Sequence, residues 1–411
     1  TLNPTFGDMN FLGRNQSLEF AFDKTVFHNH WKQSFKEPFL FGSRWRFEEW
    51  GALYYDQDAN HVGEGVGLSL VYPLFSRASR WGLQLVMDYD RNRVYRTTGS
   101  TIDTINLGGD DYEKKYQKEK LGLTALLTRS FGYEVKHYFT AGIALDRTGN
   151  TPVEAIPVLY QQDFADAVLP QDKKRNYLKF GYTLDTSHYI RVRNFFYLDR
   201  LETYAIGFRL ETMAGFSREA WGSDVDSYLL SVYLRWSFFF GNNHILAFYV
   251  NGSTELFPDG SQQNGILNAS IYYWIRNLPL GFLAFRLRGD LGEHLDVDNI
   301  FELGSGTGLR GYPANFYEGD RRLYFNIEYR FDPIKIGISR IGFLVFYDMG
   351  SCWYSSESDP RITLFPAVGV GLRFTFPSIN PNVFRFDFGY NFGNASRKFE
   401  NMLSFGYNHV F

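Results

Sequence analysis

Residues 322–332 read RLYFNIEYRFD, and their side chains fall into two alternating sets. One set is apolar throughout: Leu323, Phe325, Ile327, Tyr329 and Phe331. The other set is mostly polar and contains Arg322, Asn326, Glu328, Arg330 and Asp332. A β-strand puts residues two apart on one face, whereas a helix scatters them around its circumference. The stretch therefore predicts a strand with one apolar and one polar face.

The same alternation recurs from about residue 16 to the end of the chain. Residues 367–376 (AVGVGLRFTF) and 384–392 (FRFDFGYNF) carry it most clearly after the first stretch. In a soluble sandwich the apolar faces would pack against each other, whereas in a large membrane barrel they would face lipid. Strand length, aromatic content and an alternation of short and long connections favour the barrel.

The composition agrees with a membrane protein that crosses the bilayer with strands. Aromatic residues make up 19% of the 411 residues, with 41 Phe and 28 Tyr, yet the mean hydropathy is only −0.29. No stretch approaches the ~18 to 20 uncharged apolar residues that a spanning helix needs. In a barrel only every second residue faces lipid, so the mean hydropathy stays low. The net charge of −3 excludes the basic field of a nucleic-acid binder, and the single cysteine, Cys352, excludes an internal disulfide.

We therefore expect an all-β fold, a transmembrane antiparallel β-barrel over residues 16–411. The count of candidate strands is 16–18, and 16 is the favoured number. The number must be even for both chain ends to lie on the periplasmic side. The first strand is expected at about Gln16–Asp23, after a periplasmic lead-in at 1–15. No linker or change of composition divides the barrel into domains. The long polar connections are predicted to be external loops: about 91–116, 147–173, 214–225, 255–265 and 291–321.

Candidate metal and catalytic sites are weak. His28 and His30 are close in sequence, but a solvated loop explains them better than a metal site does. Glu293, Asp296 and Asp298 could bind calcium, although a plain acidic loop is the favoured interpretation. The sequence contains no nucleophile elbow, phosphate-binding loop or acid–base constellation. We therefore expect no enzyme activity, no cofactor and no metal.

The alternation expected of barrel strands does not explain residues 301–332, in which a long glycine-rich loop continues into the predicted strand at 322–332. The loop carries Leu309-Arg310-Gly311-Tyr312 and then Gly319-Asp320. A flexible external loop would gain nothing from this fixed order.

The order of motifs resembles the Omp85 superfamily, whose barrels insert or translocate other proteins. An Arg-Gly-aromatic loop tip is followed by Gly-Asp, then by Glu328-Tyr329-Arg330 and by Asp348-Met349-Gly350. Asn10-Phe11-Leu12-Gly13 resembles the segment that enters the first strand. The resemblance spans nearly the whole chain, but it is strong in the C-terminal third and weak between about 60 and 290.

The resemblance implies that loop 291–321 folds back into the barrel, with Arg310 against Glu328 and Asp348 and with Tyr312 on the wall. The residues themselves give partial support. Glu328 lies on the polar face of its strand, and a buried arginine needs carboxylate partners. Asp348 has apolar neighbours on both faces of its strand, so its direction stays open. The alternative is that Glu328 and Asp348 are two ordinary carboxylates without this partner.

The C-terminal residues 403–411 read LSFGYNHVF. Ser404, Gly406 and the terminal Phe411 resemble the signal by which outer-membrane barrels are recognised for insertion, while His409 departs from it. The alternative is a last strand that happens to end in phenylalanine.

The function implied by the resemblance is insertion, assembly or translocation of proteins at the outer membrane of a Gram-negative bacterium. A lateral seam between the first and last strands would template an incoming strand. The expected partners are lipid, unfolded outer-membrane or secreted proteins and accessory subunits, but not nucleic acid. Superfamily members usually carry POTRA domains before the barrel, and this sequence starts almost at its first strand. A gated or passive pore and a membrane anchor for another domain are the alternatives.

Overall fold

The computed structural model describes residues 5–24, 28–98, 101–153, 156–241, 243–296, 299–356, 362–378, 380–392 and 402–407. About 70% of the structure is strand and 5% is helix. A single antiparallel sheet contains 21 of the strands. The predicted all-β antiparallel fold is confirmed, whereas closure of the sheet and the number of 16 strands stay predictions. No helix in the described ranges has the length and apolar character to span a membrane.

The chain divides into two compact units. The first unit comprises Thr1–Tyr182, Met213–Leu229 and Phe257–Asp259, and the second comprises Thr183–Thr212, Leu230–Leu256 and Gly260–Phe411. The boundaries between the units fall inside strands and not in linkers. Residues of both units occur in β13 (Lys173–Asp185), β15 (Leu201–Ser217) and β16 (Ser227–Phe240).

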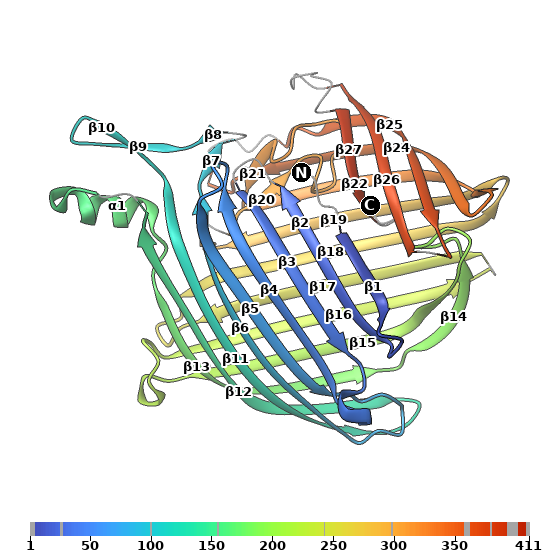
Figure 1. Ribbon diagram of the computed structural model, residues 1–411, viewed down its shortest axis with the longest axis horizontal. Coiled ribbons are helices and arrows are strands. Elements are labelled where there is room, and N and C mark those ends of the chain that lie inside the picture. Colours follow the sequence, from blue (N-terminus) through green and yellow to red (C-terminus); the bar gives the residue numbers. More distant parts are fainter. Residues whose placement is uncertain are drawn as a thin grey trace. The chain divides into compact units, whose positions relative to one another are not determined.

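The first unit is an antiparallel meander in which each long strand pairs with the next one along the chain (Figure 1, blue to green). Its long strands are β1 (Thr5–Phe11), β2 (Gln16–Lys24), β3 (His28–Glu37), β4 (Arg46–Asp56), β5 (His61–Tyr72), β6 (Trp81–Tyr95), β11 (Lys115–Phe131) and β12 (Lys136–Pro152). The short elements are the 3₁₀ turns Leu40–Gly42, Val158–Tyr160 and Glu219–Trp221, then β7 (Thr97–Thr98), β8 (Thr101–Ile102), β9 (Thr104–Leu107), β10 (Asp110–Glu113) and α1 (Gln161–Val168).

Two connections of this unit form a small core of their own. Phe164 and Val168 of α1 are fully buried together with Tyr116, at the start of β11, and Ile156. The long loops expected here are therefore partly ordered by apolar packing, with α1 beside the β9–β10 hairpin (Figure 1).

The predicted lead-in at 1–15 contains a strand, and the segment expected as the first strand is the second. Thr5 in β1 lies opposite Ala21 in β2, and Phe11 lies opposite Gln16. The sequence TFGDMNF hides this strand because Phe6 and Met9 are three residues apart and fall on opposite faces.

The second unit is also an antiparallel meander, in which β14 (His188–Arg193) pairs with β15. Its other long strands pair in chain order: β17 (His244–Leu256), β18 (Gln262–Leu278), β19 (Gly281–Glu293), β22 (Arg321–Phe331), β24 (Ser339–Trp353), β25 (Phe365–Phe376), β26 (Asn380–Asn391) and β27 (Leu403–Tyr407). Three short strands complete the unit: β20 (Phe301–Leu303), β21 (Tyr317–Gly319) and β23 (Ile334–Ile336).

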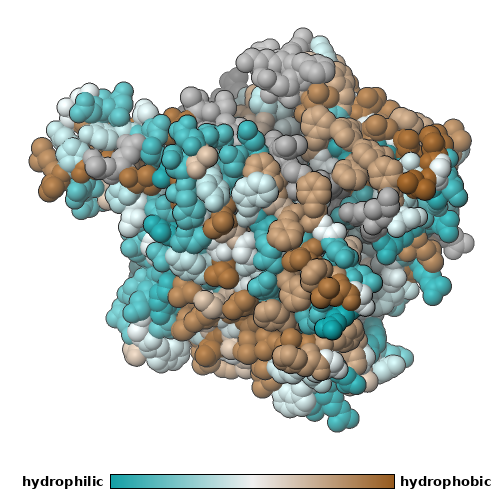
Figure 2. Space-filling view, viewed as in Figure 1, coloured by the Kyte–Doolittle hydropathy of each residue, from teal (hydrophilic) through white to brown (hydrophobic). Residues whose placement is uncertain are grey.

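The C-terminal strands of this unit have two very different faces. In β24, Phe343 and Val345 are 48% and 45% exposed, whereas Leu344, Phe346 and Asp348 are buried. Apolar side chains gather on the exposed face of β24–β27 (Figure 2, upper right). The direction of Asp348, which the sequence left open, is therefore toward the buried face.

Candidate functional site: a loop clamped on the polar face of the C-terminal strands

The loop predicted at 291–321 has a neck of two short strands. Phe301 in β20 lies opposite Gly319 in β21, and Leu303 lies opposite Tyr317. The neck holds residues 304–316 as a compact segment, which we call the clamp loop. Burial raises the pKa of Glu302 in this neck above its usual value. The carboxylate of Glu302 accepts a 3.0 Å hydrogen bond from Asn315 Nδ2.

Arg310 in the clamp loop lies between the two predicted carboxylates. Its Nε and Nη2 donate to the two carboxylate oxygens of Asp348, each at 2.8 Å, and its backbone N donates to Oδ2 at 3.1 Å. Its Nη1 donates to Glu328 Oε1 at 2.6 Å. Arg310 is 5% exposed, Glu328 1% and Asp348 0%. The bidentate fork on Asp348 is the geometry that an arginine offers and a lysine cannot.

Further charged and polar side chains that the sequence did not assign to the site surround these residues. Asp387 in β26 has an oxygen 3.6 Å from Arg310 Nη1 and accepts from Arg373 Nη1 at 2.7 Å. Arg330 Nε donates to the second oxygen of Glu328 at 2.6 Å. Asn326 Nδ2 donates to Asp348 at 2.7 Å and to the carbonyl oxygen of Gly308 in the clamp loop at 2.8 Å. The site is therefore a buried network in which the carboxylates have several donors each.

The register of the strands explains how these residues meet. Glu328, Phe346, Gly369 and Gly389 form one cross-strand row, and Asn326, Asp348, Ala367 and Asn391 form the next. The small residues on β25 and β26 leave room above the sheet for the clamp loop. The Arg310 guanidinium carbon then lies 3.6 Å from the centre of the Phe346 ring, within cation–π distance.

The loop tip sits directly on the backbone of β26. Gly311 has φ +86°, and a Cβ there would lie 2.8 Å from the Gly389 carbonyl carbon. A Cβ at Gly389 would lie 2.7 Å from Gly311 N. Asn391 Nδ2 donates to the Gly311 carbonyl oxygen at 2.6 Å. The Arg-Gly order is therefore required twice, by backbone conformation and by close approach.

Apolar packing fixes the flanks of the tip. Leu309 and Tyr312 are fully buried with Leu303, Tyr324 and Cys352. The hydroxyl of Tyr312 donates to the Pro366 carbonyl oxygen at 2.9 Å. Tyr312 thus packs on the sheet wall with its polar end satisfied.

Gly319 and Asp320 return the chain to the sheet. A Cβ at Gly319 would lie 2.2 Å from the carbonyl oxygen of Trp353 in β24. The Asp320 carboxylate accepts from Ser355 N at 2.7 Å and from Ser355 Oγ at 2.6 Å. The Gly-Asp pair therefore has a structural reason: it lets β21 approach β24 closely and ties the end of the loop.

The C-terminal signal is described only in part. Ser404 and Gly406 lie in β27, opposite Asp387 and Arg385 of β26. Phe411 lies outside the described residues, as does Asp298 of the acidic cluster.

The weaker candidates have structural explanations. His28 and His30 lie in β3 and not in the solvated loop that we expected, and their rings stack at 6.0 Å. Glu293 pairs with Arg321, and Asp296 accepts from Gln263 and Asn264 at 2.7 and 2.6 Å. The described residues contain no group of three or more His, Cys, Asp or Glu side chains that could hold a metal.

No family model and no curated protein matches the chain. Among solved structures, it is similar to BamA from Haemophilus ducreyi lacking POTRA domains 1–3, at 12% identity and a TM-score of 0.46, over 92% of this chain and 66% of that one. It is also similar to CdiB from Acinetobacter baumannii (12%, 0.46, over 99% and 59%) and to CdiB from Escherichia coli (10%, 0.48, over 93% and 58%).

BamA and CdiB are barrels of the Omp85 superfamily, the one that the sequence motifs resemble. This chain spans 58–66% of the length of these solved chains.

Proposed function

We propose that this chain is an outer-membrane β-barrel of a Gram-negative bacterium that assists the insertion of other barrel proteins into the membrane or the passage of proteins across it. The observation that supports this role best is the clamp loop. Its Arg310 is held by Glu328 and Asp348 in the order of motifs that resembles the Omp85 superfamily.

Support for a membrane location comes from the outer face of the second unit. Val345, Val370 and Phe388 are neighbours across β24, β25 and β26, and they are 45%, 56% and 38% exposed. The adjacent row continues the patch with Phe343, Leu372 and Phe386 at 48%, 37% and 38%. A continuous apolar surface of this kind on water would promote aggregation, whereas lipid covers it without cost.

The working part that we propose is the lateral seam between the first and last strands. An edge strand offers unpaired backbone N–H and C=O groups, which can template an incoming strand of any sequence. The clamp loop would keep the polar face of the C-terminal strands rigid while the seam works. Unfolded outer-membrane or secreted proteins are the proposed substrates, and accessory subunits are proposed partners.

The test is reconstitution of the full chain in liposomes, followed by addition of a urea-unfolded outer-membrane barrel protein. We expect the substrate to fold faster than in empty liposomes, and an Arg310→Ala chain to be less active. Folding is read as the shift of the substrate band on an unheated gel. A correctly inserted chain that gives no acceleration contradicts the proposal. Large steady conductance in planar bilayers without acceleration would favour a pore instead.

A further inference from the structure

Two neighbouring cavities lie on the polar face of the second unit, beside the clamp loop. The first has a volume of about 320 Å³ and lies over β17, β18 and β19. The second has a volume of about 250 Å³ and is bounded by the clamp-loop residues Ser305 to Gly308. Arg288 in β19 lines both cavities, so a single ligand could occupy them together.

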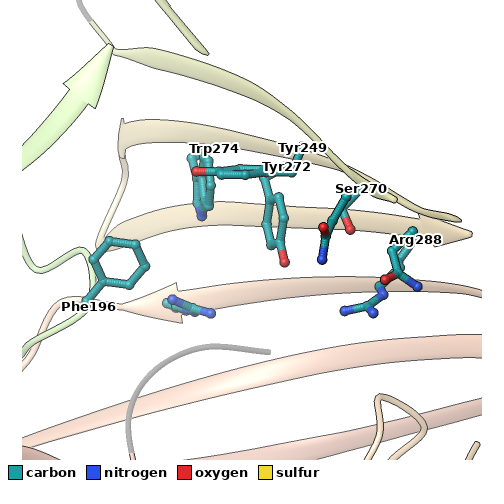
Figure 3. Close-up of a pocket in the computed structure, with 9 residues that line it drawn as sticks. Phe196, Tyr249, Ser270, Tyr272, Trp274 and Arg288 are labelled. Atoms are coloured by element: carbon teal, nitrogen blue, oxygen red, sulfur yellow. The ribbon is translucent and has the colours of Figure 1, made fainter. Parts of the chain in front are cut away.

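Aromatic rings form one wall of the first cavity. Trp274 and Tyr272 of β18 stack with ring centres 5.4 Å apart and an interplanar angle of 11°, and Tyr249 meets Tyr272 edge-on. Figure 3 shows these rings between Phe196 at one end and Arg288 at the other. Flat aromatic faces of this kind bind the C–H faces of sugar rings as well as apolar groups.

Polar side chains stand beside the aromatic wall. Asn251 of β17 lies opposite Asn268 of β18, and Ser270 lies opposite Arg288. Amide and hydroxyl groups can both donate and accept hydrogen bonds, which suits the hydroxyl groups of a sugar. A strand-like peptide is disfavoured because the backbone of β18 already pairs with β17 and β19.

The cavity is preformed at its Phe196 end. One carboxylate oxygen of Glu202 accepts hydrogen bonds from the backbone N of Phe195, Phe196 and Tyr197 at 2.9–3.0 Å. Phe195 is buried against Trp274, with ring centres 4.8 Å apart. This end therefore needs little rearrangement to receive a ligand.

Arginines dominate the lining of the second cavity, and two of them, Arg310 and Arg385, lie within 4 Å of carboxylates of the clamp-loop network. Four arginines line it besides Arg310: Arg286, Arg288, Arg322 and Arg385. The carboxylate of Asp290 is shared between Arg288, at 2.8 Å, and Arg322, at 2.7 Å. One carboxylate between two guanidinium groups leaves net positive charge, which favours an anionic group in this cavity.

We propose that the two cavities form one binding site for an acidic saccharide, a sugar that carries a phosphate or carboxylate group. The sugar ring packs on the half-buried rings of Tyr249 and Tyr272, which the buried Trp274 supports, with its hydroxyl groups near Asn251. Its anionic group lies against Arg288 and the basic cavity. The proposal is independent of the insertion function, since it concerns only side chains of the polar face.

The test is calorimetric titration of the detergent-solubilised full chain with glucose 6-phosphate, glucose and inorganic phosphate. Wild-type chain should bind glucose 6-phosphate at least about tenfold more tightly than either of the other two, because only this probe carries both a sugar ring for the aromatic wall and an anionic group for the basic cavity. Phosphate binding as tight as that of the sugar phosphate would overturn the saccharide assignment. Absence of binding by glucose 6-phosphate would overturn the site.

Two variants separate the contributions of the cavities. Arg288→Gln should weaken glucose 6-phosphate about tenfold or more and leave glucose unchanged, since it removes a charge-assisted contact. Asn251→Ala should weaken both sugars. The matched control is Arg91→Gln in the first unit, whose arginine side chain is 49% exposed. If Arg288→Gln binds like this control, the proposal is wrong.

The source of the saccharide is distinguished in vesicles. The chain is reconstituted in phosphatidylcholine with or without a phosphorylated glycolipid, and glucose 6-phosphate is titrated into both. Competition by the glycolipid assigns the site to a lipid headgroup, whereas unchanged binding assigns it to a free saccharide. Loss of binding in both vesicles would contradict the site.

Discussion

At the residue scale, the site depends on how the charge of the buried Arg310 guanidinium group is compensated. Removing one member of a buried ion pair leaves its partners as uncompensated buried charges, which lowers the stability of the fold by about 3–5 kcal/mol. We expect Arg310→Ala to lower the unfolding free energy in urea by this amount, because Asp348 and Glu328 lose their shared donor. Arg91→Ala, which removes an exposed ion pair with Glu64, should change it by less than about 1 kcal/mol.

Exchanging the charges of Arg310 and Glu328 should not rescue the loss. The exchanged carboxylate at position 310 would face Asp348 and Asp387, whose oxygens lie 2.8 and 3.6 Å from the guanidinium group in the native chain. Full recovery of stability in the double variant would show that the pair acts alone and not as part of the network.

The sequence predicted part of this network, and the limits of that prediction are physical. The alternation of its strand predicts the mostly polar face on which Glu328 lies. Asp348 stayed open because Phe346 beneath the loop and Val345 on the outer face are equally apolar. Asp387 and Arg373 reach the site through the pairing of β25 with β26, and that register is not written in either strand alone.

At the scale of elements, the clamp loop and β26 meet through backbone at Gly389. Gly389→Ala should unseat the loop tip, because the added Cβ would lie 2.7 Å from Gly311 N, and overpacking of this kind costs about 1–3 kcal/mol. We expect faster cleavage of residues 304–316 by an added protease while the strands stay protected. The matched control is Gly289→Ala in β19, where the nearest atom to a new Cβ is a Leu323 methyl carbon at 3.9 Å. Equal cleavage rates in the two variants would contradict the close approach at Gly389.

The same scale shows which elements a pattern of alternating residues finds and which it misses. The long strands were predictable because a face that contacts lipid or a core requires an apolar side chain at every second residue. The β20–β21 neck and α1 were not, since they are short and are ordered by packing with distant residues such as Tyr324 and Tyr116. Thr5–Phe11 was missed because Phe6 falls on the face opposite Met9 and Phe11, which breaks an already short alternation.

At the scale of the whole molecule, we propose that the apolar faces of the strands contact lipid and that the polar face of the C-terminal strands carries the clamp loop.

The direct measurement is a nitroxide scan of residues 366–374 along β25, on a Cys352→Ser background, with the chain reconstituted in liposomes. Each spin label reports its accessibility to oxygen, which concentrates in lipid. We predict a period of two, with high accessibility at Val368, Val370 and Leu372 and low accessibility at Ala367, Gly369 and Gly371, because the first set is exposed and the second lies under the clamp loop or among its neighbours. Uniform low oxygen accessibility, or high accessibility only to a water-soluble relaxing agent, would contradict a lipid-facing sheet.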